Sequence, residues 1–194
     1  ESYPWKFQGI EVAGKYNFLS PAKDDFGLSG YSSLEYGVLD VHSGQKKTEY
    51  EFDAGLQAQK YFLEGQLVWV GNFDIRAAYE KRKAVDTTVE WTTDPEMEIN
   101  LKFGTGVSYR FAPGWFAGVE AQRESEFETE VGLERWSTFA GPTVHWAGER
   151  WWTTLTYFQQ IQGGGEKYEG QSDDDLHLIE KTKYEVRLKV GYNF

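Results

Sequence analysis

The clearest pattern in this chain is strict alternation of apolar and polar side chains over long segments. Residues 97–111 show it best, because every odd position is apolar or threonine, while the even positions carry charges, polar groups or glycine. A helix would scatter those charges around its whole circumference. The period of two therefore predicts a β-strand with one apolar and one polar face.

Similar alternation, interrupted by turn signals, predicts nine strands. They lie at approximately residues 5–19, 26–39, 48–62, 66–81, 96–111, 115–126, 134–146, 150–162 and 178–194. The strands of soluble sheets usually have about 5–6 residues, whereas a tilted membrane strand needs about 9–11 residues inside the hydrocarbon. The predicted segments are longer than typical strands of soluble sheets and long enough to cross the hydrocarbon of a membrane.

The predicted connections alternate in length. Short ones lie near 20–25, 62–65, 112–114 and 146–149, and long polar ones near 39–47, 82–95, 127–133 and 163–177. Short periplasmic turns and longer extracellular loops are typical of outer-membrane barrels. We therefore expect an all-β protein, an antiparallel transmembrane up-and-down β-barrel, with residues 1–194 as one domain.

Aromatic residues make up 17% of the chain and gather near the predicted strand ends. Amphipathic rings settle at the headgroup level of a bilayer, which predicts two aromatic girdles. The candidate girdle residues are Phe111, Trp115, Trp136, Trp146, Trp151, Tyr184, Tyr192 and Phe194. The alternative is that aromatic residues are simply common in strands.

Composition agrees with a membrane barrel. The mean hydropathy of −0.61 is too low for helical membrane spans, but only alternate residues of a barrel strand face lipid. The net charge of −11 argues against nucleic acid as a partner. The absence of cysteine fits an envelope protein without disulfides. No N-terminal signal segment precedes the first strand, so the sequence reads as a mature or truncated form.

The strand count suggests that the wall is incomplete. The final strand should run inward to Phe194, which places the start of the first strand on the external side. Bacterial single-chain barrels have an even strand number with both termini in the periplasm. We therefore expect one or more N-terminal strands to be missing, unless another chain completes the wall or a strand has been split or overlooked.

The polar face is rich in ionisable groups. The candidate lumen-lining residues are Glu35, Glu51, Asp53, Asp74, Arg76, Glu98, Lys102, Arg110, Glu120, Glu185, Arg187 and Lys189. They either form an ion-pair network that fills a narrow lumen or line a water-filled channel. Val68 and Val70 fall on this face as well, which predicts a bulge there or a partly apolar lumen.

The sequence gives little evidence for a catalytic, metal-binding or phosphate-binding site. His145 has no serine within reach in the predicted strands, since Ser108 lies two strands away and Ser137 lies far along the same strand, so we expect no enzyme. The acidic run 173–175 is typical of a solvated loop, although it could bind Ca²⁺. Gly163–Gly165 lacks a phosphate-loop lysine and is expected to be flexible loop. We expect no cofactor and no metal.

Several motifs resemble a family of bacterial outer-membrane β-barrel proteins of unknown function. They are the turn Arg110-Phe-Ala-Pro-Gly-Trp115, the C-terminal strand Arg187-Leu-Lys-Val-Gly-Tyr-Asn-Phe194, and weaker matches over nearly the whole chain. The resemblance implies extra strands ahead of residues 5–19, with roughly 10–12 strands in the complete barrel. It also implies that the terminal Phe194 is read by the barrel-assembly machinery. It brings no catalytic residues.

These observations predict a porin-like pore or transporter for a small solute in the outer membrane of a Gram-negative bacterium. The expected partners are the lipid bilayer, lipopolysaccharide and the barrel-assembly machinery, with another chain where one completes or contacts the barrel. The alternative is a non-conducting barrel that anchors or scaffolds an extracellular or membrane partner. A soluble lipocalin-like barrel, with its apolar faces turned inward, is the structural alternative.

Overall fold

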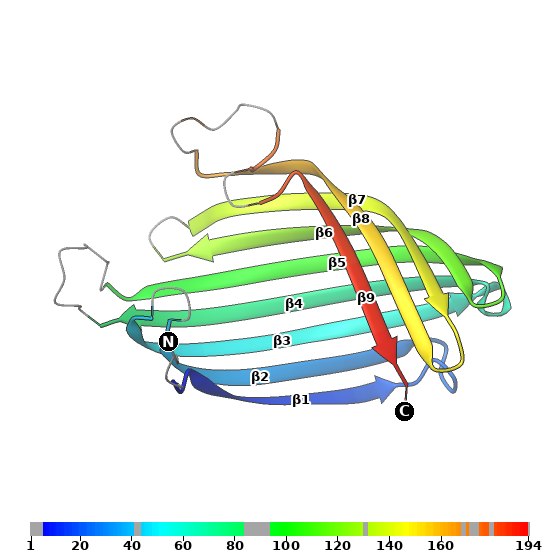
Figure 1. The fold of residues 1–194 in the computed structure, drawn as a ribbon, viewed down its shortest axis with the longest axis horizontal. Coiled ribbons are helices and arrows are strands. Elements are labelled where there is room, and N and C mark those ends of the chain that lie inside the picture. Colours follow the sequence, from blue (N-terminus) through cyan, green and yellow to red (C-terminus); the bar gives the residue numbers. More distant parts are fainter. Residues whose placement is uncertain are drawn as a thin grey trace, which may run out of the picture.

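The computed structural model describes residues 6–40, 44–83, 94–129, 132–167, 170, 175–178 and 181–193. Within them, nine antiparallel strands form one sheet in the order of the sequence (Figure 1). The strands are β1 Gly9–Leu19, β2 Gly27–Leu39, β3 Lys46–Phe62, β4 Leu67–Arg82, β5 Glu96–Ala112, β6 Trp115–Glu128, β7 Gly132–Ala147, β8 Trp151–Gly165 and β9 Tyr184–Tyr192. The predicted all-β, up-and-down antiparallel arrangement of nine strands is confirmed.

The connections between β1 and β2, β3 and β4, β5 and β6, and β7 and β8 are short and lie at one end of the sheet, because an up-and-down order alternates the ends of successive connections (Figure 1). Between β3 and β4, a 3-10 turn at Leu63–Gly65 holds both Leu63 and Glu64 at positive φ. Between β5 and β6, Gly114 adopts φ 74°, a conformation that favours glycine. No helix among the described residues has the length and hydropathy needed to cross a membrane.

Two predicted connections are wrong. The one predicted at 127–133 is short, because β6 and β7 remain paired up to Glu128 and Gly132. Gly132 takes φ 77°, which permits the tight reversal. The glycine run expected to be flexible loop belongs to β8, where Gly163, Gly164 and Gly165 pair with β7.

Val68 and Val70 lie on the polar face of a regularly paired β4. The pairing of β4 with both neighbours contains no shift at Val68 or Val70. Val68 lies opposite Ser108, and Val70 lies opposite Gln59, so both valines belong to the polar face. That face therefore contains a small apolar patch and β4 has no bulge.

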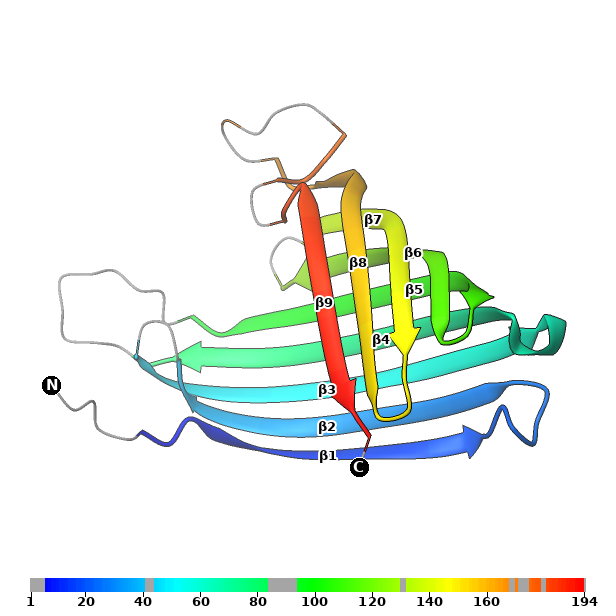
Figure 2. The same ribbon diagram turned by 45° about the vertical axis from the view of Figure 1, so that its right-hand side comes forward.

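The sheet curls so that β7, β8 and β9 cross over the earlier strands (Figures 1 and 2). In the described part of the chain, β1 pairs with β2 alone and β9 pairs with β8 alone. The nine strands thus form an open, curved sheet. Its closure into a barrel stays a prediction.

Candidate functional site

One face of the sheet is apolar and open to the surroundings. Val12, Leu34 and Phe52 lie side by side across β1, β2 and β3, with 71%, 65% and 41% of their surfaces exposed. On β9, Val186, Leu188 and Val190 continue the same pattern at the opposite edge. Large apolar side chains in a soluble sheet would instead be covered.

The opposite face is polar and much less accessible. Gln122, Ser137, Thr156 and Gln160 are all at most 5% exposed, although each is a polar residue. Side chains of non-adjacent strands also meet on this face: Arg187 of β9 donates a hydrogen bond to Gln122 of β6 at 2.9 Å. Only the concave side of a curved sheet brings such strands together. The polar face is therefore the inside of the curve.

The strongest charged cluster links β2, β3 and β4. The Arg76 guanidinium donates to the Asp53 carboxylate at 3.0 Å and lies 3.4 Å from Glu51. The Tyr31 hydroxyl reaches across β3 to donate to Asp74 at 2.7 Å. Ion pairs and charge-assisted hydrogen bonds of this kind offset the cost of placing charges away from bulk water.

A second cluster lies on β5 and β6. The Lys102 ammonium contacts the Glu124 carboxylate at 2.7 Å, and Lys181, which precedes β9, contacts the other oxygen of the same group at 3.2 Å. Together with the first cluster it borders an open cavity of about 570 Å³. The lining residues are Tyr31, Asp53, Asp74, Ile75, Arg76, Glu98, Asn100, Leu101, Lys102, Glu124, Glu126 and Lys181.

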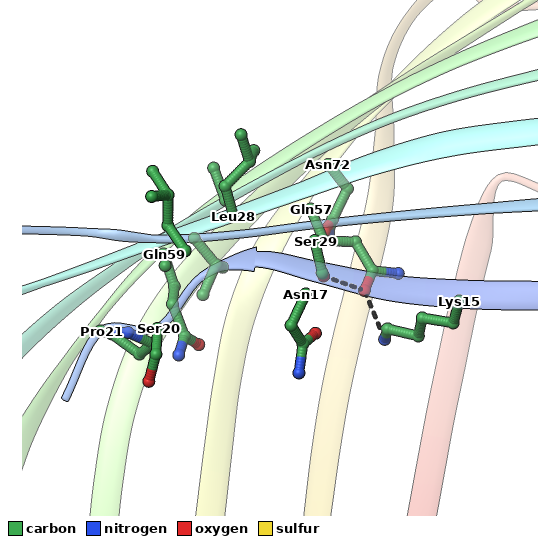
Figure 3. Close-up of a pocket in the computed structure, with 13 residues that line it drawn as sticks. Lys15, Asn17, Ser20, Pro21, Leu28, Ser29, Gln57, Gln59 and Asn72 are labelled. Atoms are coloured by element: carbon green, nitrogen blue, oxygen red, sulfur yellow. Dashed lines mark hydrogen bonds between the residues drawn. The ribbon is translucent and has the colours of Figure 1, made fainter. Parts of the chain in front are cut away.

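A smaller cavity of about 330 Å³ lies on β1 to β4 near the short connections. Its polar lining is mostly uncharged, with Asn17, Ser29, Gln57 and Asn72 beside the single ammonium of Lys15. Lys15 and Ser29 both donate to the Gln57 side-chain oxygen, at 2.8 Å and 3.3 Å (Figure 3). The concave face thus has a charged region and a largely neutral one.

The structure places the twelve predicted charged residues on the polar face, but it does not bring all of them together. The ion pairs formed are Arg76 with Glu51 and Asp53, Lys102 with Glu124, and Arg187 with Glu185, and Asp74 accepts a hydrogen bond from Tyr31. Glu120 accepts a hydrogen bond from Thr156. Four others lie apart from these pairs: Glu35 faces Glu51 across the register, Glu98 accepts from Asn100, and Arg110 and Lys189 are exposed towards the short connections.

Four of the ionisable residues that line the large cavity were not among the predicted lumen-lining residues: Tyr31, Glu124, Glu126 and Lys181. Glu124 and Glu126 share the parity of Glu120 on β6, so the alternation already contained the signal for them. Tyr31 has the correct parity but a residue type that suggested the apolar face. Lys181 falls within the predicted strand 178–194 at the parity of Glu185 and Arg187, so alternation held a signal for it too, although in the structure it precedes β9.

The predicted girdle residues lie near the strand ends. Trp115 and Trp146 are cross-strand neighbours with ring centroids 6.4 Å apart, and Trp151 contacts Tyr192 edge-on at 4.9 Å. Phe111, on the same side, is exposed. At the other end, Arg123 covers the Trp136 ring at 4.1 Å and Tyr184 stacks on Tyr157. Phe194 lies outside the described residues.

His145 contacts no serine among its described hydrogen-bond partners. Its Nδ1 lies 2.7 Å from the Thr154 hydroxyl, on the neighbouring strand. Ser137 is fully buried on the polar face. Of the acidic run, residues 173 and 174 lie outside the described part of the chain.

Comparison with known proteins assigns a family but no activity. A model described as a family of unknown function, DUF6662, matches residues 1–194, so the chain belongs to that family. The chain is also similar to a protein named NLP effector protein Pc118551 from Phytophthora capsici, with 29% identity over 123 residues. That match covers 59% of this chain and 47% of the other, so the chain spans about half the length of this relative. No solved structure matches.

Proposed function

We propose that this member of the DUF6662 family is an integral outer-membrane β-barrel protein whose polar interior forms a pathway for a small solute. One observation carries the proposal. The apolar face is exposed across all nine strands, while the polar face is concave and is most covered on β6, β7 and β8. Water would penalise this arrangement and hydrocarbon would favour it.

Several features support a pathway within such a barrel. The concave face carries two open cavities of about 570 Å³ and 330 Å³, both with polar linings. The free edges of β1 and β9 support a wall of roughly 10–12 strands, with strands beyond these nine closing it. Each added strand favours a lumen between the side chains, because the diameter of a barrel grows with strand number.

The alternative is a non-conducting barrel that anchors or scaffolds a partner. A specific observation favours it: beneath β6 to β9 the interior is packed, since Phe139, Phe158 and Gln160 are each at most 2% exposed. If the remaining wall closed against this packed half, the interior would have no continuous water path. The pore and the non-conducting anchor would have the same fold and would differ in whether they conduct ions.

The relative from Phytophthora capsici is named an effector, which suggests a second alternative setting. This chain would then be recovered from the culture medium and not from a membrane fraction.

The test is expression of the full reading frame in a Gram-negative host, followed by fractionation and planar-bilayer recording. We expect the protein in carbonate-washed outer membranes, with an electrophoretic mobility that changes on heating, and stepwise conductance after reconstitution. A heat-denatured sample of the same preparation serves as the control. Membrane recovery without conductance would favour the anchor, and recovery as a folded protein from the medium or the soluble fraction would refute the membrane proposal.

Assembly through the C-terminal residue can be tested in the same host. If the barrel-assembly machinery reads Phe194, its deletion should reduce the amount of heat-modifiable protein in the outer membrane. Substitution by Tyr, which keeps an aromatic ring, should largely restore it.

A further inference from the structure

The segment that leads into β9 is held inside the curve of the sheet. Gln160 of β8, which is 1% exposed, accepts a hydrogen bond from the His177 backbone N–H at 2.7 Å and donates to the His177 carbonyl at 3.0 Å. It also donates to the Thr182 carbonyl at 3.2 Å. A single buried side chain thus fixes two points of the segment.

A glycine makes room for this arrangement. The Gly163 N–H donates to the Asp175 carbonyl at 2.8 Å, and a Cβ at Gly163 would overlap the His177 backbone nitrogen. His177 itself is fully buried. The segment is therefore anchored to the concave face at His177 and at the Thr182 carbonyl, while Asp175, Leu178, Thr182 and Lys183 remain exposed.

The consequence is that Lys181 lines the large cavity from outside the strand wall. Its ammonium reaches Glu124 of β6 across the concave face, at 3.2 Å. Asp53, Asp74 and Arg76 line the same cavity. The segment therefore narrows the cavity and adds one positive charge to it.

The charge of the lining remains negative after this addition. Five carboxylates border the cavity, against the three cations Arg76, Lys102 and Lys181. Each cation already contacts a carboxylate, and Lys102 and Lys181 share one. Glu126, the remaining neighbour on β6, is paired with Arg135 at 2.6 Å.

Two of the lining carboxylates receive neutral donors in place of cations. Asp74 accepts from the Tyr31 hydroxyl and Glu98 from the Asn100 amide. Next to the cavity, Glu11, Glu35 and Glu51 lie in register across β1, β2 and β3, and Arg76 contacts only the last of them. The field in this part of the interior is therefore that of excess negative charge.

We propose that this cavity determines the ion selectivity of the pathway, that it favours small cations over anions, and that Lys181 limits the strength of this preference. The inference rests on the proposed function, because it requires a conducting barrel. Fixed charges of one sign along an ion path favour the passage of ions of opposite sign. Since Lys181 opposes the surrounding carboxylates, its removal should strengthen the selection of cations.

The test measures zero-current potentials in planar bilayers across a KCl gradient, which give the ratio of potassium to chloride permeability. We expect the unsubstituted protein to prefer potassium. Lys181→Met should raise the ratio about twofold, because one unit charge roughly 8 Å from the ion path acts oppositely on potassium and chloride and is screened by salt in an aqueous lumen. Asp53→Asn with Asp74→Asn should move the ratio towards unity.

Matched controls remove the same charges elsewhere. Lys23 is exposed in the connection between β1 and β2, and Glu64 is exposed in the turn between β3 and β4. The control substitutions are Lys23→Met and Glu64→Gln. Both should leave the ratio unchanged. Heat-modifiable mobility verifies folding before each recording. If the double variant does not fold, Asp74→Asn alone replaces it, because an amide oxygen still accepts from the Tyr31 hydroxyl.

The outcomes separate this inference from the proposed function. A folded, reconstituted protein without conductance refutes the pathway and the inference with it. Stepwise conductance with no preference for potassium overturns the inference and leaves the pore intact. Equal shifts in Lys181→Met and Lys23→Met would also overturn it, since the cavity would then have no special position in the ion path.

Discussion

Introduction of the same charge on the two faces of β4 distinguishes a lipid-facing sheet from a water-facing one. Phe73 is the central outward residue of β4, lies opposite Leu56 and Phe103, and is 44% exposed. Its neighbour Asn72 lies on the polar face, opposite Gln57. Phe73→Arg and Asn72→Arg place identical side chains at nearly the same depth, on opposite sides of the sheet.

The expected magnitudes differ strongly if hydrocarbon covers the apolar face. Arginine at the bilayer midplane costs about 2–4 kcal/mol on the lipid-facing side of a barrel. That loss lowers the folding equilibrium constant by about 1.5 to 3 powers of ten. Asn72→Arg should change the free energy of unfolding by about 0.5 kcal/mol or less, because Asn72 is exposed on a polar surface.

The assay is urea-dependent unfolding of the protein reconstituted in phospholipid vesicles, followed by the fluorescence of its eight tryptophans. Phe73→Leu is the control, because it shortens the side chain and keeps it apolar. A water-facing sheet predicts the reverse: Phe73→Arg would be harmless and would improve solubility. Comparable losses for both arginine variants, or a larger loss for Asn72→Arg, would show that the faces have been assigned incorrectly.

Three further predictions are tested by membrane insertion, by urea unfolding, and by hydrogen exchange with proteolysis. Leu101→Arg should impair membrane insertion more than Lys102→Leu, and the opposite order in the insertion assay would contradict the face assignment. Gly141→Ala should destabilise the sheet by about 1–3 kcal/mol, because the added methyl overlaps a backbone carbonyl of β8. Gly14→Ala, where the methyl meets open space, should be nearly neutral, so equal urea midpoints for the two alanine variants would argue against that packing. Gln160→Leu should release the segment before β9, seen as faster hydrogen exchange and proteolysis there with the strands still protected; unchanged exchange would mean that other contacts hold the segment.

The strands could be predicted because their signal is local. In β5, alternation from Met97 to Phe111 is set by the period of two in an extended chain, whatever the neighbours are. The same parity placed Asp53, Arg76 and Lys102 on one face. Glu124 shares the parity of Glu120 on β6, so the sequence held the information for this residue as well.

Other features depend on contacts between distant residues. Whether Val68 and Val70 mark a bulge or an apolar patch depends on pairing with β3 and β5, and alternation within β4 cannot decide it. The sequence alone predicts that Gly163 belongs to a loop. In the structure it pairs with Ser137 in the sheet, and the His177 backbone lies so close that a side chain at residue 163 would not fit. Lys181 reaches Glu124 from a segment that Gln160, on the preceding strand, holds through the His177 and Thr182 carbonyls.

The sequence by itself determined that long two-faced strands follow one another with short reversals, because alternation and turn chemistry act over a few residues. Only the tertiary structure decided which side of the sheet curves inward, which charges meet across it, and that the described strands leave two edges unpaired. The physical reason is range: strand period is a property of neighbouring residues, whereas curvature, ion pairing and cavity shape arise from the register of residues far apart in the chain.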